Sequence, residues 1–107
     1  MINNDGTGGE SIYGMVFRDE NMTISHDSRY LVTMVKTKGR PHTNNSQFMI
    51  TLAPQLWLDN RQVVVGRVMP GTSRDLVDYI EANYATTSLS LMEVPLATIR
   101  ISACAIL

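Results

Sequence analysis

The side chains with the greatest capacity for chemistry in this sequence are two histidines and a single cysteine. No cysteine or acidic cluster stands at metal-ligand spacing from His26 or His42, so the sequence predicts no metal site. We interpret both histidines as surface loop residues. Cys104 lies in an apolar stretch near the C-terminus and is expected to be a small core residue rather than a nucleophile. No arrangement of Ser, His and Asp suggests hydrolysis.

A glycine-rich run near the N-terminus, Gly6-Thr7-Gly8-Gly9, could suggest phosphate binding. It lacks GxGxxG spacing and the Lys-Ser/Thr of a P-loop, and no helical pattern follows it. Turn geometry explains the run as well, because glycine adopts backbone conformations that other residues avoid. The sequence therefore predicts no cofactor.

The rest of the chain alternates between apolar runs, which we interpret as strands, and turn-rich loops. Polar loops occupy residues 36–46 and 54–61. The strands are predicted at residues 31–34, 47–52, 63–68 and 96–101, of which 63–68 is the clearest because it holds three consecutive valines.

One helix is predicted at about residues 73–82. Thr72 is a good N-cap, and Asp75 follows three residues later as its acidic capping partner. Leu76, Val77 and Ile80 then share one face. The pattern over residues 86–93 is ambiguous.

The order of these elements indicates a mainly β fold. Strands that follow one another across loops favour an antiparallel sheet or barrel over parallel βαβ units. About five strands and one helix make a poor closed barrel, and an open sheet leaves unpaired edges. We therefore expect missing strands or a partner chain to cover that edge.

Composition narrows the class of protein. The net charge of -1 argues against nucleic-acid binding, and no apolar run reaches the roughly 18 residues of a membrane span. A lone cysteine cannot form an internal disulfide, and the N-terminus has no secretory-signal pattern. The expectation is one domain over residues 1–107 in the cytoplasm or another intracellular reducing compartment.

Three segments in fixed order resemble the cyclophilin-type peptidyl-prolyl isomerase family. The first is residues 6–14, continuing to Asn21, and the second is residues 44–51, similar to the family's Asn-Gly-Ser-Gln-Phe-Phe-Ile. The third is residues 57–59 followed by residues 63–68. The motifs agree in order and nearly in spacing, and the helix and last strand fit the family in kind.

The resemblance implies an eight-stranded antiparallel barrel capped by two helices. This chain would be its C-terminal two-thirds, a partial barrel that lacks the first strands and the first helix. Rotation about a peptide bond has a barrier of roughly 18–20 kcal/mol. In the family, an arginine donates a hydrogen bond toward the proline nitrogen and so stabilises the transition state. None of this chain's arginines aligns with it, so no catalytic residue is assigned.

The resemblance also implies substrate-binding residues. Gln47 matches the glutamine that hydrogen-bonds the substrate backbone, and the other positions line or border the proline pocket. The full implied set is Gly6, Thr7, Gln47, Met49, Trp57, Leu58 and Gln62. Five of these residues have a structural alternative: Gln47 as a solvated glutamine, Met49 as a core residue, Trp57 as a core residue or loop anchor, and Gly6 and Thr7 as residues that shape a turn.

Departures from the family's pattern lie in the same region. Met49 replaces a pocket phenylalanine, and Gln62 replaces a histidine. Residues 35–38 replace the family's Ala-Asn-Ala, in a loop two residues longer than usual. The resemblance thus implies an isomerase domain that binds Xaa-Pro segments of peptides or proteins, with weak or lost activity and no support for cyclosporin binding. The alternative is a non-catalytic structural or binding subunit, with a partner chain or an N-terminal segment completing the barrel.

Overall fold

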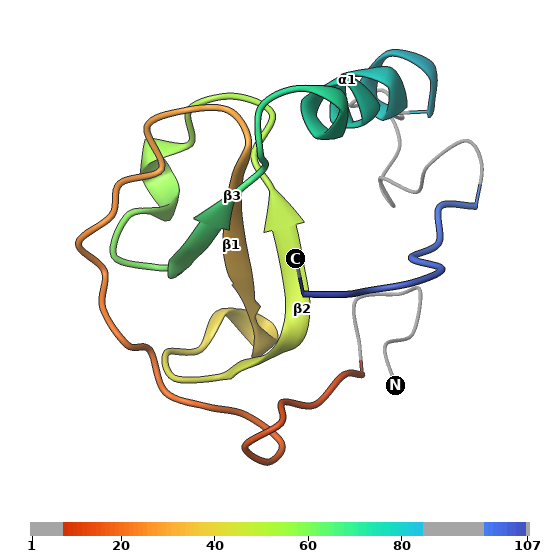
Figure 1. The fold of residues 1–107 in the computed structure, drawn as a ribbon. Helices are drawn as coiled ribbons and strands as arrows, with labels where there is room; N and C mark the ends of the chain where they lie inside the picture. The colour runs from red at the N-terminus through yellow and green to blue at the C-terminus, as the bar shows by residue number, and fades with distance from the viewer. Residues whose placement is uncertain (1–7, 85–97, 107) are drawn as a thin grey trace. The chain divides into compact units, whose positions relative to one another are not determined.

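A three-stranded antiparallel sheet organises the first part of the chain (Figure 1). The computed structural model describes residues 8–84 and 98–106. Strand order is β2-β1-β3. The strands are β1 (Leu31–Lys36), β2 (Asn44–Ile50) and β3 (Val64–Arg67). Both neighbours pair with β1, which is rich in the β-branched residues that suit a pleated surface.

The register between the strands is interrupted by two irregularities. Thr33 pairs with Met49 of β2, and a register shift after Met34 then brings Lys36 opposite Asn44. On the other side, a shift after Val32 places Thr33 opposite Val64. Such bulges re-aim side chains. Here the ends of β1 and β2 bring a lysine and an asparagine together.

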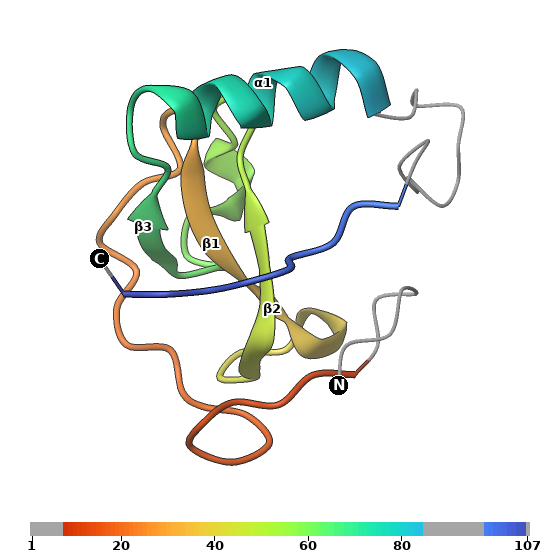
Figure 2. The same ribbon diagram turned by 45° about the vertical axis from the view of Figure 1, so that its right-hand side comes forward.

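Two short 3₁₀ turns connect the strands. The first, η1 (Thr37–Gly39), follows β1 and contains Lys38 at φ 52°. The second, η2 (Leu56–Leu58), lies between β2 and β3. The Leu56 carbonyl accepts a hydrogen bond from Asp59 N at 3.0 Å, and Asn60 adopts φ 64°, which closes the turn. Before β1, the chain first runs below the sheet (red), where Phe17 pairs with Asn44 of β2, and then rises on the β3 side (orange), as Figures 1 and 2 both show.

The interior of this part of the chain is strongly polar. The buried apolar residues are Leu58, Val63 and Val64. The buried polar residues are His26, Thr33, Lys36, Asn44 and Thr51. Among the described residues, every fully enclosed side-chain nitrogen or oxygen has a hydrogen-bond partner. Because an unpaired buried polar group is costly, the interior depends on specific hydrogen bonds as much as on apolar packing.

The chain divides into two compact units, Met1–Val68 and Met69–Leu107. The second holds α1 (Thr72–Tyr84), where the Gly71 carbonyl accepts hydrogen bonds from Arg74 N and Asp75 N, both at 3.1 Å. The predicted helix is confirmed with longer bounds, but Thr72 is its first residue rather than its cap. In the part of the chain that is described, no helix is long and apolar enough to cross a membrane.

Several predictions about the elements are corrected. Residues 44–46 belong to β2 rather than to a loop, because Asn44 pairs with both Lys36 and Phe17. Of the predicted closing strand, residues 98–101 carry no strand, and residues 96–97 lie outside the described residues, as do residues 86–93. The described residues form an open sheet of three strands in place of about five.

Two predictions about reactive side chains are also wrong. His26 is fully buried rather than on the surface, because its ring finds hydrogen-bond partners inside the fold. Cys104 is exposed, in a segment without regular structure. His42 is an exposed loop residue, as expected.

Candidate functional site

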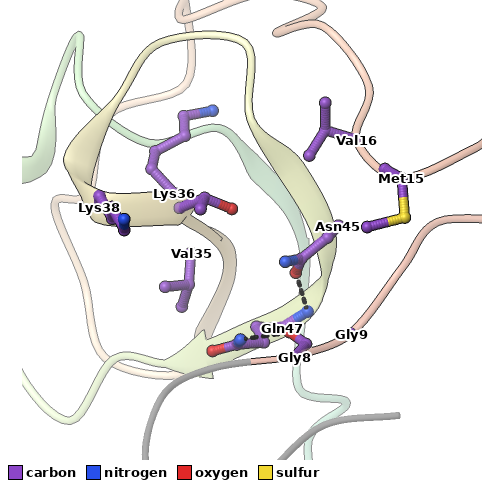
Figure 3. A pocket seen from close by; sticks show the side chains of 10 residues that line it. Gly8, Gly9, Met15, Val16, Val35, Lys36, Lys38, Asn45 and Gln47 are labelled. Atoms are coloured by element: carbon purple, nitrogen blue, oxygen red, sulfur yellow. Dashed lines mark hydrogen bonds between the residues drawn. The ribbon is translucent and has the colours of Figure 1, made fainter.

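Two clefts contain most of the described residues that the sequence singled out. The first encloses about 300 Å³ and has Gln47 in its wall (Figure 3). Its lining residues are Gly8, Gly9, Met15, Val16, Val35, Lys36, Thr37, Lys38, Asn45 and Gln47. The cleft therefore lies between the glycine-containing N-terminal segment and the ends of β1 and β2.

Gln47 ties β2 to that N-terminal segment. Its amide nitrogen Nε2 donates a hydrogen bond to the Gly8 carbonyl at 2.8 Å, and its backbone N–H donates to Asn45 Oδ1 at 2.8 Å. Figure 3 shows Val35 on one side of Gln47, with Met15 and Val16 across the cleft. The cleft thus places an amide, which is bonded to Gly8, between apolar side chains, and apolar walls with a few polar groups are typical of binding pockets.

The second cleft encloses about 370 Å³ and is built around the η2 turn. Its lining residues are Asp19, Met22, Lys36, Gly39, Pro41, Trp57, Leu58, Asn60, Arg61 and Gln62. Trp57 is 65% exposed, and its indole N–H donates to Gln55 Oε1 at 2.6 Å. Leu58 is 1% exposed. The turn therefore buries the leucine as an anchor and presents the tryptophan to solvent.

Lys36 lines both clefts and belongs to a buried ionic cluster. Its ammonium contacts the Asp19 carboxylate and donates to Asn44 Oδ1 at 2.6 Å. Asn44 Nδ2 donates in turn to Asp19 Oδ1 at 2.8 Å and to the Phe17 carbonyl at 3.1 Å. Burial lowers the pKa of Lys36, while the adjoining carboxylate favours its charged form.

Asp59, directly after η2, accepts three hydrogen bonds from the segment ahead of β1. They come from His26 N at 2.7 Å, Ser25 Oγ at 2.6 Å and the His26 ring nitrogen Nδ1 at 2.9 Å. These donors stabilise the carboxylate, with the His26 backbone N–H contributing most, and lower the pKa of Asp59 from 3.8 to about 2. Asp59 is therefore a charged residue at every ordinary pH.

The structure distributes the implied site residues over separate places. Gln47 lies in the first cleft, whereas Trp57, Leu58 and Gln62 line the second. Met49, on β2 opposite Thr33, is among the lining residues of neither cleft. Gly6 and Thr7 lie outside the described residues. The two glutamines therefore do not share a cleft, and Lys36 is the side chain that connects their surroundings.

Sequence reasoning missed Lys36, Asp19 and Asn44 as a cluster. The sequence placed Lys36 and Asn44 in a solvated loop, and the register shift that turns them inward leaves no local sequence signal. Asp19, far upstream, carries no sign of its partner either. Among the described residues, no group of three or more His, Cys, Asp or Glu side chains could hold a metal ion.

A family model and the curated relatives of this chain all belong to the same family. Residues 2–106 match the family model described as cyclophilin type peptidyl-prolyl cis-trans isomerase/CLD. Peptidyl-prolyl cis-trans isomerase D of Eremothecium gossypii is 45% identical over 107 residues, which is 100% of this chain and 27% of that protein. Peptidyl-prolyl cis-trans isomerase cyp15 of Rhizopus delemar is 51% identical over 79 residues, which is 73% of this chain and 12% of that protein.

A solved structure shows the same likeness in three dimensions. A Cryptosporidium parvum cyclophilin-type peptidyl-prolyl cis-trans isomerase, crystallised in the presence of the dipeptide Ala-Pro, superposes with a TM-score of 0.71 at 30% identity. The match covers 85% of this chain and 54% of that one. This chain therefore spans about half of the solved neighbour and a smaller share of the curated relatives.

Proposed function

Because this chain belongs to the cyclophilin-type peptidyl-prolyl isomerase family, we propose that it binds Xaa-Pro segments of peptides or proteins, with little isomerase activity of its own. The observation that supports the proposal is the presentation of Trp57. Its indole is 65% exposed at the edge of a cleft of about 370 Å³, while the adjoining Leu58 is fully buried. An exposed aromatic ring held by a buried anchor is a typical peptide-binding feature.

The proline ring of a bound segment would pack against Trp57, and Gln62 would offer an amide beside it. The solved relative in the presence of Ala-Pro supports this ligand class. Proline suits such a surface because its restricted ring loses little conformational freedom when it binds.

The expectation of weak catalysis follows from the charges around the clefts. An isomerase must aim a preorganised donor at the imide nitrogen as that nitrogen loses conjugation. The Lys36 ammonium is directed to the Asp19 carboxylate, which compensates its charge, and to the Asn44 amide oxygen, which accepts a hydrogen bond from it. Arg61 lines the second cleft but is exposed, so water screens its charge.

A second candidate function is a non-catalytic structural module within a larger assembly. Apolar side chains remain exposed on the sheet strands: Phe48 at 47%, Met49 at 36% and Val65 at 57%. A partner chain or a preceding segment that completed a cyclophilin-like barrel would cover part of this surface. Because β2 and β3 are the outer strands of the sheet, exposed apolar side chains on them favour association.

A titration of the chain with an Ala-Pro-containing tetrapeptide tests the peptide-binding proposal. We expect the indole N–H resonance of Trp57 to shift on binding and Trp57→Ala to weaken the affinity about tenfold. The matched control is Leu56→Ala, because Leu56 is 61% exposed on the same turn but does not line the cleft. Leu56→Ala should bind like the parent chain.

The same samples serve for a prolyl-peptide isomerisation assay. We expect at most a small acceleration over the uncatalysed rate. Peptide binding with normal affinity by Trp57→Ala would contradict the binding proposal. Strong acceleration by the parent chain would contradict the proposed loss of catalysis and leave the binding surface in place.

A further inference from the structure

His26 clamps both ends of the turn that carries Trp57. At the start of η2, the His26 carbonyl accepts a hydrogen bond from Gln55 N at 2.8 Å. Just after the turn, Asp59 accepts from the backbone N–H of His26 at 2.7 Å and from its ring at 2.9 Å. One fully buried residue, from the segment ahead of β1, therefore fixes the entry and the exit of the turn.

The His26 ring is itself fixed by the central strand. Its Nε2 lies 2.9 Å from the hydroxyl of Thr33, and both residues are 0% exposed. The Thr33 hydroxyl also lies 3.5 Å from Gln62 Oε1, next to the second cleft. The hydrogen-bonded chain Thr33–His26–Asp59 thus connects β1 to the far end of the turn.

Hydrogen bonds continue through this chain from the turn to the strands. The ionised Asp59 can only accept, so His26 Nδ1 donates to it. The Thr33 hydroxyl lies 2.9 Å from His26 Nε2 and 3.1 Å from the Val63 carbonyl, so it joins the His26 ring to the backbone just before β3. Burial strengthens the hydrogen bonds of such a network.

We propose that Thr33, His26 and Asp59 are positioning residues that hold the η2 turn so that Trp57 is preorganised for the Xaa-Pro ligand. The inference rests on the proposed peptide-binding function and adds a mechanism to it. Trp57 itself is mostly exposed, and its indole N–H donates to Gln55 Oε1 at 2.6 Å, so its side chain is held by the residue that begins the turn. The orientation of Trp57 therefore depends on the two ends of a three-residue turn, and both ends are tied to His26.

The test compares two buried threonines in the full chain. Thr33→Val removes the hydroxyl that holds the His26 ring, while Thr33→Ser keeps it. Thr51→Val is the matched control, because Thr51 is 1% exposed and its hydroxyl also joins two segments. That hydroxyl donates to the Ser28 carbonyl at 2.9 Å and accepts from Leu31 N at 2.9 Å, with no link to the turn.

Two measurements are made on each variant. One is the affinity for an Ala-Pro-containing tetrapeptide, and the other is the indole N–H resonance and acrylamide quenching of Trp57, the chain's only tryptophan. We expect Thr33→Val to weaken affinity about fivefold, to broaden the indole resonance and to increase quenching. Thr33→Ser and Thr51→Val should keep the parent affinity and the parent Trp57 signals, even where they lower the melting temperature.

The outcomes separate the positioning role from general stability and from the proposed function. Parent-like Trp57 signals in Thr33→Val, or equal losses in Thr51→Val, would overturn the proposal. If Thr33→Val does not fold, Asp59→Asn is measured in its place and should loosen Trp57 in the same way. If the parent chain binds no peptide, the proposed function fails, and the Trp57 signals without peptide still decide whether the chain positions the turn.

Discussion

At the scale of single residues, the buried polar side chains are the feature that the sequence predicted least well. His26 illustrates why the sequence could not reveal it. Its partners are one residue seven positions away and another 33 positions away, and no local pattern marks either of them. In contrast, Trp57 lies in the polar loop predicted over residues 54–61, and the structure exposes it. Local composition is consistent with this exposure, whereas burial of a polar residue depends on distant partners.

Asp59 should make the stability of the chain depend on pH in the acid range. Its pKa is lowered to about 2 in the folded chain, against 3.8 for an unperturbed carboxyl. A lowered folded-state pKa stabilises the fold above the unfolded-state pKa, and this contribution is lost as the pH falls through the folded-state pKa. We therefore expect the parent chain to be more stable than Asp59→Asn at pH 6, with the difference shrinking between about pH 4 and pH 2.

Urea unfolding of both chains across this pH range measures the effect. Subtracting one chain from the other cancels the carboxylates that they share, as long as those lie far from Asp59. A stability difference that stays constant down to pH 2 would show that the hydrogen bonds of Asp59 do not depend on its charge.

At the scale of elements, the sequence predicted which segments are strands or helices better than it predicted where they begin and end. The strands at 31–34, 47–52 and 63–68 and the helix all exist, because β-branched runs and one-face apolar spacing are local signals. The start of β2 was missed because Asn44-Asn45-Ser46 has the composition of a turn. Backbone pairing with Lys36 and Phe17 overrides that preference. The same pairing aligns Asn44 with Lys36 and so creates the ionic cluster.

The Lys36–Asp19 pair should be strongly coupled, because both side chains are more than nine-tenths buried. Lys36→Met leaves a buried carboxylate without its countercharge, which we expect to cost about 3 kcal/mol of unfolding free energy. The double variant Lys36→Met/Asp19→Asn removes both charges and should recover at least about 1 kcal/mol of that loss.

Chemical denaturation of the parent, the two single variants and the double variant completes the cycle. The control pair is Arg18→Met with Glu20→Gln, exposed residues on either side of Asp19, for which the effects should be small. Additive losses at Lys36 and Asp19 would mean that each interacts mainly with Asn44 and not with the other.

At the scale of the whole molecule, the sequence predicted the family but not the architecture of the sheet. Three motifs in fixed order were enough to predict the cyclophilin family, which the family model and the relatives confirm. Closure of the barrel could not be predicted from such motifs, because it depends on pairing between strands that are far apart in the sequence. The described residues provide three strands, in which β2 and β3 are the outer ones. The predicted strand over residues 96–101 shows the limit: its apolar pattern is present, but residues 98–101 find no strand partner in this structure.

The outer strands should make the isolated chain associate with itself. An edge strand presents unpaired backbone N–H and C=O groups, and apolar side chains beside it promote pairing with another chain. Val65 on β3 is 57% exposed, so we expect reversible association that grows with concentration in sedimentation velocity experiments. Val65→Lys should reduce this association, because a charge on an edge strand opposes pairing.

The control variant is Ile12→Lys. Ile12 is 92% exposed but lies outside the sheet, so this change should leave association unchanged. A chain that stays monomeric at every concentration, and unfolds in one cooperative step, would show that the sheet needs no partner.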